Sequence, residues 1–422
     1  MHILRITAAS FKSEMQKIKD GLEPHIDYKG LLQKVLKTKS NNIAAISTAL
    51  RKQQYQVTDV IHDVEWLQKK WAEERSFKFS GNNWWKEILA EQIKFYQPDI
   101  LFIQHTCPFR KAEIAKIKST CKIKAILLHT GYLGSVESIG PVDHIFAATP
   151  SLAFRYSKQN YSSSVLYHYF DESLIELFAD IPKVYDFTFV GASGYSSGYV
   201  HSERYWLLRR FFEETDLKGW LLENEVIHPA NWKTFLKEIF KNTLSLFPNT
   251  LLCKFSNKSV DSVRNTIEEF MIERSAKTRR IQLPREKIGE LYPSRVEGPV
   301  AGMSYYEIIA KTKISFHAKG TSLVENVGKI HGDIGAIRLF EATGLGSCLL
   351  SDSGKNMSDL FEDGKEIVTY SCPDEAVEKA KYLVENPIEA AKIAIKGQEK
   401  TLKSHTALNR AYVINEWIRT NL

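Results

Sequence analysis

Cysteine is scarce in this sequence of 422 residues, and no two cysteines stand at a metal-binding spacing. The five that occur are scattered, odd in number and without a Cys-x-x-Cys pair: Cys107, Cys121, Cys253, Cys348 and Cys372. This pattern is typical of reduced structural thiols in a cytoplasmic protein, and it argues against a cysteine zinc cluster.

Long hydrophobic runs are also missing. The N-terminal stretch MHILRITAASFKSEM turns polar too early for a signal peptide, and no run approaches the roughly 18 apolar residues of a membrane span. We therefore expect a cytoplasmic protein, either free or at the inner face of the membrane. The net charge of +7 predicts mild affinity for nucleotides, phosphorylated lipids or membrane surfaces, and it is too small to imply a nucleic-acid partner.

Metal-binding motifs are a third absence. The sequence has no Asp-x-Asp between apolar runs, no His-Glu-x-x-His and no His-x-His, which are motifs that hold divalent ions. The segment GASGYSSG lacks the Lys-Ser/Thr ending of a phosphate-binding loop, which argues against ATP hydrolysis. We expect neither a metal nor a cofactor.

What is present is a regular alternation of strand-like and helix-like segments. The apolar runs HILRIT, YQVTDVI, PDILFIQH and KAILLH are separated by helical patterns such as WWKEILAEQIKFY. Such segments form βαβ units, because a parallel return needs a crossover. With the length of the chain, this predicts an α/β protein with two Rossmann-like domains, residues 1–170 and 183–405. A C-terminal helix, residues 406–422, then follows and can pack back on the first domain.

The segment RLFEATGLGSCLLSDS, residues 338–353, contains two glycines between a helical pattern and an apolar run. A dinucleotide-binding turn has the opposite order, with a strand before the first glycine and a helix after the third. The segment therefore predicts a helix that carries Arg338 and Glu341, then a glycine turn, then a buried strand.

Four C-terminal segments carry a family resemblance: GMSYYEIIAKTKISF, RLFEATGLGSCLLSD, LFEDGKEIVTY and SHTALNR. Together with YDFTFVG followed by HSER, they resemble the second domain of GT-B glycosyltransferases, and most of all the CgeB-like group. The resemblance covers residues 185–415 and implies two Rossmann-like domains with a ligand cleft between them. It also implies transfer of a hexosyl or related sugar from a nucleotide-sugar donor to a hydroxyl-bearing acceptor (a glycan, a lipid-linked molecule or a protein) in glycan or surface polysaccharide biosynthesis.

The donor site is predicted around the helix of Glu341. Its carboxylate can accept hydrogen bonds from both ribose hydroxyls, and Arg338, one turn earlier, can neutralise the diphosphate or orient Glu341. Gly344 and Gly346 allow the backbone to approach the ligand closely. The alternative is a surface ion pair between Arg338 and Glu341, with the glycines capping the helix.

A second group of donor contacts follows predicted strands. The loop after YDFTFVG offers backbone N–H groups and hydroxyls just before a helix, and such an arrangement binds phosphate. In the resembling family this segment lies at the mouth of the cleft, so Gly191, Ser193 and Arg204 are candidate diphosphate contacts. Lys319 is a candidate for stabilising the leaving diphosphate. The alternative for Arg204 and Lys319 is a solvated surface charge.

The catalytic candidates are one carboxylate and two histidines. Asp333 lies eight residues before Glu341, where retaining GT-B enzymes often carry a carboxylate; it either contacts the donor sugar or N-caps the helix of Glu341. His129 and His105 end predicted strands of the N-terminal domain, where an imidazole can act as a general base toward the acceptor or bind the donor sugar. The alternative for each histidine is a structural role.

Two other functions are compatible with this architecture. A sugar-nucleotide epimerase needs acid and base groups across the cleft and no acceptor, and a catalytically silent GT-B protein has a structural role. The sequence leaves the donor base, the sugar, the stereochemical outcome and the oligomeric state open.

Overall fold

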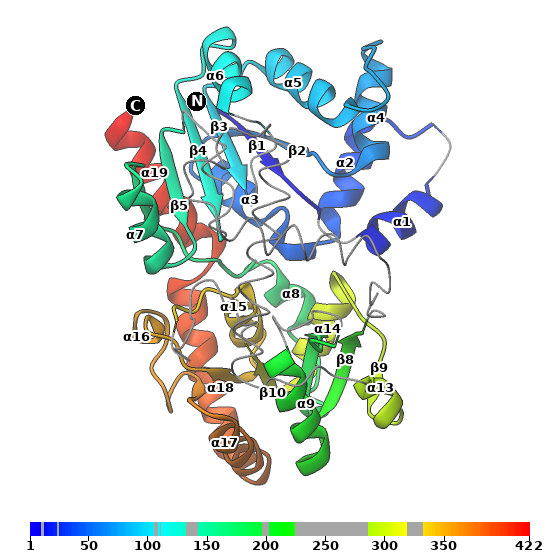
Figure 1. The fold of residues 1–422 in the computed structure, drawn as a ribbon, viewed down its shortest axis with the longest axis vertical. Helices are drawn as coiled ribbons and strands as arrows, with labels where there is room; N and C mark the ends of the chain where they lie inside the picture. The colour runs from blue at the N-terminus through cyan, green and yellow to red at the C-terminus, as the bar shows by residue number, and fades with distance from the viewer. Residues whose placement is uncertain are drawn as a thin grey trace, which may run out of the picture.

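The computed structural model describes residues 1–9, 12–22, 25–104, 109, 111–131, 142–195, 202–223, 286–318 and 332–422. Within these ranges the chain forms two six-stranded parallel sheets, one in each half of the molecule (Figure 1). In that view the N-terminal half lies above the C-terminal half. The predicted α/β fold with two Rossmann-like sheets is confirmed.

The N-terminal sheet has the strand order β2-β1-β3-β4-β5-β6, and all its pairs are parallel. Strands β3 and β4 are buried along their whole length, as expected for parallel strands covered by helices on both faces. The strands are β1 (His2–Thr7), β2 (Gln56–Ile61), β3 (Ile100–Gln104), β4 (Ala125–Thr130), β5 (His144–Ala147) and β6 (Ser163–Val165).

Helices cover both faces of this sheet. The described ones of this half are α1 (Lys12–Asp20), α2 (Tyr28–Lys37), the 3-10 helix η1 (Ser40–Asn42), α3 (Ala45–Lys52), α4 (Glu65–Glu74), α5 (Trp84–Tyr96), α6 (Lys111–Thr120) and α7 (Pro150–Lys158). Helices α5, α6 and α7 pack on one face through Leu89, Ile114 and Tyr156. Helix α3 packs on the other face through Ile46 and Leu50.

The C-terminal sheet has the order β12-β11-β10-β7-β8-β9 and is also parallel. Its strands are β7 (Tyr185–Ala192), β8 (Lys218–Leu222), β9 (Val296–Glu297), β10 (Thr312–His317), β11 (Cys348–Asp352) and β12 (Val368–Tyr370). The described helices of this half are α8 (Leu174–Phe178), α9 (Ser202–Glu214), α13 (Ile288–Leu291), α14 (Met303–Ala310), α15 (Ile337–Gly344), α16 (Met357–Leu360), α17 (Pro373–Glu385) and α18 (Pro387–Ser404). The last helix, α19 (Ala407–Asn421), packs on the N-terminal half.

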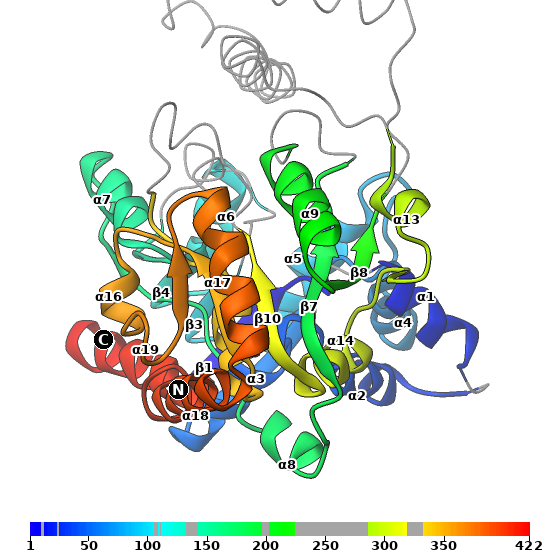
Figure 2. The same cartoon turned by 90° about the horizontal axis from the view of Figure 1, so that it is seen from below.

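Two hydrophobic cores sandwich the C-terminal sheet. Helices α9 and α17 lie alongside β7 and β10 (Figure 2) and fill one core with Phe211, Phe212 and Val377. Helices α14 and α15 fill the other core with Tyr306, Leu339 and other apolar residues. Because α15 packs between the sheet and the N-terminal half, its side chains can reach both.

The junction between the halves is formed by the segment around Phe170 and the turn before α19. The Phe170 N–H donates to the His405 carbonyl at 2.8 Å, and the Ala407 N–H donates to the Phe170 carbonyl at 2.9 Å. Thr406 then begins α19 with a capping box. Helix α19 leaves the C-terminal half and packs against α3, where Ile414 shares a core with Ile46 (Figure 1).

Candidate functional site

The carboxyl ends of the C-terminal strands gather polar side chains at one edge of the sheet. Strand β10 ends at His317, β11 at Asp352 and β12 at Tyr370. Helices α9 and α15 bring Arg204 and Arg338 to the end of β7, as the backbone contacts of the two guanidinium groups show. Ligands of open α/β sheets bind at this edge, so these groups form the candidate site.

Arg338 is held against the end of β7 and a tyrosine ring. Its Nη1 donates to the Val190 carbonyl, and its guanidinium lies 5.1 Å from the ring centre of Tyr305. The next residue, Gly191, has φ +153°, and a Cβ there would lie 3.2 Å from Arg338 Nη1. Gly191 therefore matters because a side chain would crowd the arginine.

Arg204 brings a second positive charge to the same place. Its Nη1 donates to the Ala192 carbonyl at 3.0 Å, and its Nε has no hydrogen-bond partner among the described residues. Burial, together with the charge of Arg338, lowers the pKa of Arg204 to about 10, while Asp352 opposes this shift. Two guanidinium groups that repel each other in a partly buried place are stabilised by an anion.

His317 and Asp352 complete this edge, and the sequence analysis did not single them out. His317 Nδ1 lies 3.1 Å from Ser351 Oγ and 3.5 Å from Asp352 Oδ1. Burial lowers the pKa of His317, Asp352 opposes the lowering, and the two arginines add to it. The signal in the sequence was their place as the last residues of the apolar runs KISFH and CLLSD.

Glu341 is buried and bound by two tyrosine hydroxyls from α14. Tyr305 donates to Oε2 at 2.9 Å, and the Tyr306 hydroxyl lies 3.2 Å from Oε1. Burial raises the pKa of Glu341, and Arg338 and the two hydroxyls oppose that rise. Because Arg338 and Glu341 have these different partners, the structure differs from a solvated surface ion pair.

Gly344 and Gly346 lie at the opposite edge of the sheet, because the turn they form precedes β11. A Cβ on Gly344 would lie 2.5 Å from the Phe170 ring, and Gly346, with φ +71°, lies beside Gln398. The Ser347 N–H donates to the Ala342 carbonyl at 3.0 Å, which closes the end of α15. This corrects the ligand-facing role expected from the sequence: the two glycines terminate a helix.

Ser193 makes a hydrogen bond within its own loop, and Asp333 makes hydrogen bonds to the N-terminal half. Buried Ser193 follows β7, and its Oγ accepts from the Tyr195 N–H at 3.2 Å. Asp333 Oδ2 accepts from the Ser151 N–H at 2.6 Å and from its hydroxyl, at the first turn of α7 in the other half. Helix α15 instead has Ala336 at its N-cap, so the alternative that Asp333 caps the helix of Glu341 is wrong.

His129, the residue before the last of β4, is buried in a network of polar side chains. Its Nε2 lies 3.0 Å from the Leu166 carbonyl, which can only accept, so Nε2 carries the proton and Nδ1 faces the Gln104 amide at 3.4 Å. Gln104 Oε1 accepts from Arg5 at 2.6 Å, and Arg5 pairs with Asp59 at 2.6 Å. The imidazole is thus oriented by neighbours on both sides.

A small cavity of about 20 Å³ lies between this network of polar side chains and the start of α15. The residues that line it include Arg5, Asn42, Gln104, His129, His168 and Ile337. His168 is half-buried, and its ring centre lies 5.5 Å from that of His129. The carboxyl edge of the N-terminal sheet therefore faces the start of the helix that carries Arg338 and Glu341.

Two of the predicted site residues are not among those that the structure describes. His105 and Lys319 lie outside the described residues. In the part of the chain that is described, no cluster of His, Cys, Asp and Glu is arranged to hold a metal ion. Over the same residues, no helix combines the length and apolar character needed to cross a bilayer.

Comparison with known proteins shows which folds and families this chain is similar to. Residues 264–416 match a family model described as "Glycosyl transferase-like". No curated protein matches the sequence. Three solved structures align over nearly the whole chain: HepE of Anabaena in complex with UDP and glucose (11% identity, 100% of each chain, TM-score 0.51), a glycosyltransferase involved in avilamycin A biosynthesis (10%, 99% of this chain and 97% of the other, 0.51), and sucrose-phosphate synthase of Thermosynechococcus elongatus (9%, 100% and 98%, 0.50). At these identities the likeness shows the fold. The chain has the GT-B fold, and its residues 264–416 are similar to the glycosyl transferase-like family.

Proposed function

We propose that this protein is a glycosyltransferase of the CgeB-like group that moves a sugar from a nucleotide-sugar donor to a hydroxyl-bearing acceptor in glycan or surface polysaccharide assembly. The observation that carries the proposal is the pair of guanidinium groups of Arg204 and Arg338 at the carboxyl edge of the C-terminal sheet. A diphosphate satisfies both charges and offers acceptors to Arg204 Nε, which has no hydrogen-bond partner among the described residues.

The reaction follows from this placement. The ribose hydroxyls donate to Glu341, and the diphosphate lies against the two arginines. As the bond between the anomeric carbon and the diphosphate breaks, negative charge passes to the nucleoside diphosphate, where the fixed guanidinium groups stabilise it. The acceptor oxygen bonds to the anomeric carbon, and its proton passes to a base on the N-terminal side. Because the arginines neutralise the leaving group, we propose catalysis without a divalent ion.

The acceptor side is assigned to the N-terminal half. His129 and the half-buried His168 lie at its carboxyl edge, around the cavity that faces α15. The acceptor classes that fit a hydroxyl nucleophile are a glycan, a lipid-linked molecule and a protein. The net charge of +7 is compatible with work at an anionic membrane surface.

A thermal-shift screen against UDP, GDP, dTDP and CMP tests the donor site. UDP is the first probe because one HepE structure contains UDP and glucose. A ligand that binds the native state raises its melting temperature, so one of these nucleotides should do so, and the matching nucleotide-sugar should then release nucleoside diphosphate. A changed sugar that remains bound to the nucleotide would indicate an epimerase, and no binding or turnover would indicate a silent protein.

A further inference from the structure

The hydroxyl of Tyr306 lies among three acceptors from the two halves of the molecule. It is 3.2 Å from Glu341 Oε1 in its own half, and 3.1 Å from Asn42 Oδ1 and 3.0 Å from the Lys39 carbonyl in the N-terminal half. A tyrosine hydroxyl has one proton to donate. Glu341 and the N-terminal half therefore compete for the same proton.

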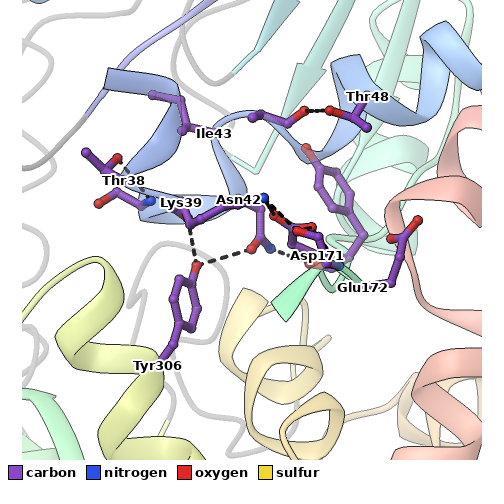
Figure 3. A network of polar contacts seen from close by, with 12 residues as sticks. Thr38, Lys39, Asn42, Ile43, Thr48, Asp171, Glu172 and Tyr306 are labelled. Carbon is purple, nitrogen blue, oxygen red and sulfur yellow. Dashed lines mark hydrogen bonds and ion pairs between the residues drawn. The ribbon is translucent and has the colours of Figure 1, made fainter. Parts of the chain in front are cut away.

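The acceptors on the N-terminal side belong to one tightly held segment, Lys39 to Ile43 (Figure 3). The Asn42 amide donates to the Tyr169 carbonyl at 2.6 Å, which turns its Oδ1 toward Tyr306. Lys39 Nζ lies 3.2 Å from Asp171 Oδ2, and Arg5 donates to the Ile43 carbonyl. The segment thus connects Tyr306 with the buried network of polar side chains of the N-terminal sheet.

The backbone of this segment is in an uncommon conformation. Lys39 has φ +59° and Asn42 has φ +54°, both in the left-handed region. Non-glycine residues persist there when surrounding contacts determine the geometry. The conformation of the segment therefore depends on contacts such as the hydrogen bond to Tyr306.

On the other side of Glu341, the network continues to the proposed diphosphate site. Tyr305 donates to Glu341 Oε2 at 2.9 Å, and its ring lies 5.1 Å from the guanidinium of Arg338. A continuous series of contacts therefore runs from Arg338 through Tyr305, Glu341 and Tyr306 to Asn42. It joins the two places where donor and acceptor are expected to bind.

We propose that Tyr306 is a positioning residue that couples occupation of the nucleotide site to the N-terminal half. When ribose hydroxyls donate to Glu341, they compete with Tyr306 for its oxygens, and the Tyr306 proton turns to Asn42 Oδ1 or the Lys39 carbonyl. Nucleotide binding then tightens the segment from Lys39 to Ile43, beside the cavity lined by Asn42 and His129. This inference rests on the proposed function, because it takes Glu341 as the ribose ligand.

Reciprocity follows from such a coupling. If the nucleotide stabilises the N-terminal segment, a ligand that stabilises the same segment raises nucleotide affinity by the same factor. The donor then prepares the acceptor side before the acceptor arrives. Coupling factors of this kind are typically about 5- to 150-fold.

Hydrogen exchange on the full chain measures this coupling. UDP, GDP and dTDP are each added to saturation, and amide exchange in the peptide that contains Lys39 to Ile43 is followed by mass spectrometry. In the wild-type protein, the nucleotide that binds should slow this exchange by about 5-fold or more. In Tyr306→Phe the nucleotide should still bind, and the slowing should disappear.

Tyr305→Phe is the matched control. It removes the other hydroxyl on Glu341 and leaves the contact of Tyr306 with Asn42 in place. The ring that faces Arg338 remains in this variant, so we expect the nucleotide to bind and to produce the same slowing at saturation. If Tyr306→Phe does not fold, Asn42→Ala removes one of the two acceptors on the other side and should reduce the slowing.

The results distinguish a failure of the coupling from a failure of the proposed function. If no nucleotide binds the wild-type protein, the proposed function fails, and the coupling fails with it. If a nucleotide binds and exchange slows equally in the wild-type protein and Tyr306→Phe, the proposed function stands and the role of Tyr306 is overturned. Binding to the wild-type protein without any slowing also overturns it.

Discussion

The polar side chains at the carboxyl edges of the two sheets differ in how fully they are satisfied. In the N-terminal sheet, Arg5 is bound by Asp59, Gln104 and a backbone carbonyl, and His129 is oriented on both sides. In the C-terminal sheet, two arginines repel each other, and Arg204 Nε has no partner among the described residues.

This difference indicates that the N-terminal edge stabilises the fold and that the C-terminal edge binds a ligand. A satisfied buried network stabilises a particular arrangement, and removing one member leaves the others unpaired. An arrangement of like charges is unfavourable until a ligand of opposite charge arrives. We therefore expect substitutions at the N-terminal edge to affect folding and substitutions at the C-terminal edge to affect binding.

The largest expected effect is on Arg5. Arg5→Ala leaves the buried Asp59 without its closest ion-pair partner, so unfolding in urea should show a loss of about 3 to 5 kcal/mol. Arg51→Ala is the control, because Arg51 pairs with the same carboxylate but its side chain is 45% exposed. It should cost less than about 1 kcal/mol. Equal losses would contradict the view that the buried network stabilises this edge.

The junction between the halves should also affect folding, and His405 makes this effect measurable as a dependence of stability on pH. Burial and the charge of Arg410 lower the pKa of His405 to about 4. Between the ordinary value of about 6.5 and about 4, the unfolded chain binds a proton that the native protein does not, so stability falls as the pH falls. Relative to His405→Gln, the wild-type protein should lose about 3 kcal/mol over this range. Parallel pH profiles would show that His405 takes up a proton in the folded state.

His129 tests whether a satisfied residue is also a catalytic one. His129→Ala removes the partner of Gln104 and the Leu166 carbonyl, so we expect a loss of stability of about 1 to 3 kcal/mol and a modest effect on turnover. A drop in turnover of about 10²- to 10⁴-fold with unchanged stability would instead identify a general base. Urea unfolding and nucleoside diphosphate release, measured on the same preparation, decide between them.

The smallest expected effect is that of a chelator. If Arg204 and Arg338 neutralise the leaving diphosphate, excess EDTA should leave turnover unchanged. Loss of activity in EDTA that manganese or magnesium restores would show that a divalent ion contributes to the C-terminal site.

The fold was largely predictable because several strands lie in continuous apolar runs. WWKEILAEQIKFY forms α5, and the buried runs that follow form β3 and β4, since strands covered on both faces must be apolar throughout. The helix of Arg338 and Glu341 was predicted for a related reason. Its order of helix, glycine turn and strand fits only one direction through the sheet.

The contacts of the site were not predictable in the same way, because they join distant parts of the chain. Asp333 binds Ser151, and Tyr306 reaches Asn42 in the other half. The two residues of each pair are far apart in the sequence, and no repeating pattern of residues predicts such a contact. The glycines were misinterpreted because a turn before a strand and a turn after one look alike in composition, although they lie at opposite edges of the sheet.

The central claim is that the C-terminal edge binds the diphosphate of the donor. Calorimetric titration of the wild-type protein, Arg204→Ala and Arg209→Ala with the nucleoside diphosphate found in the thermal-shift screen tests it most directly. Arg209 lies on the same helix but pairs with Glu213 at the surface. Arg204→Ala should weaken binding by about 1.5 to 3 kcal/mol, and Arg209→Ala should match the wild-type protein. Equal affinity for all three proteins would contradict the account.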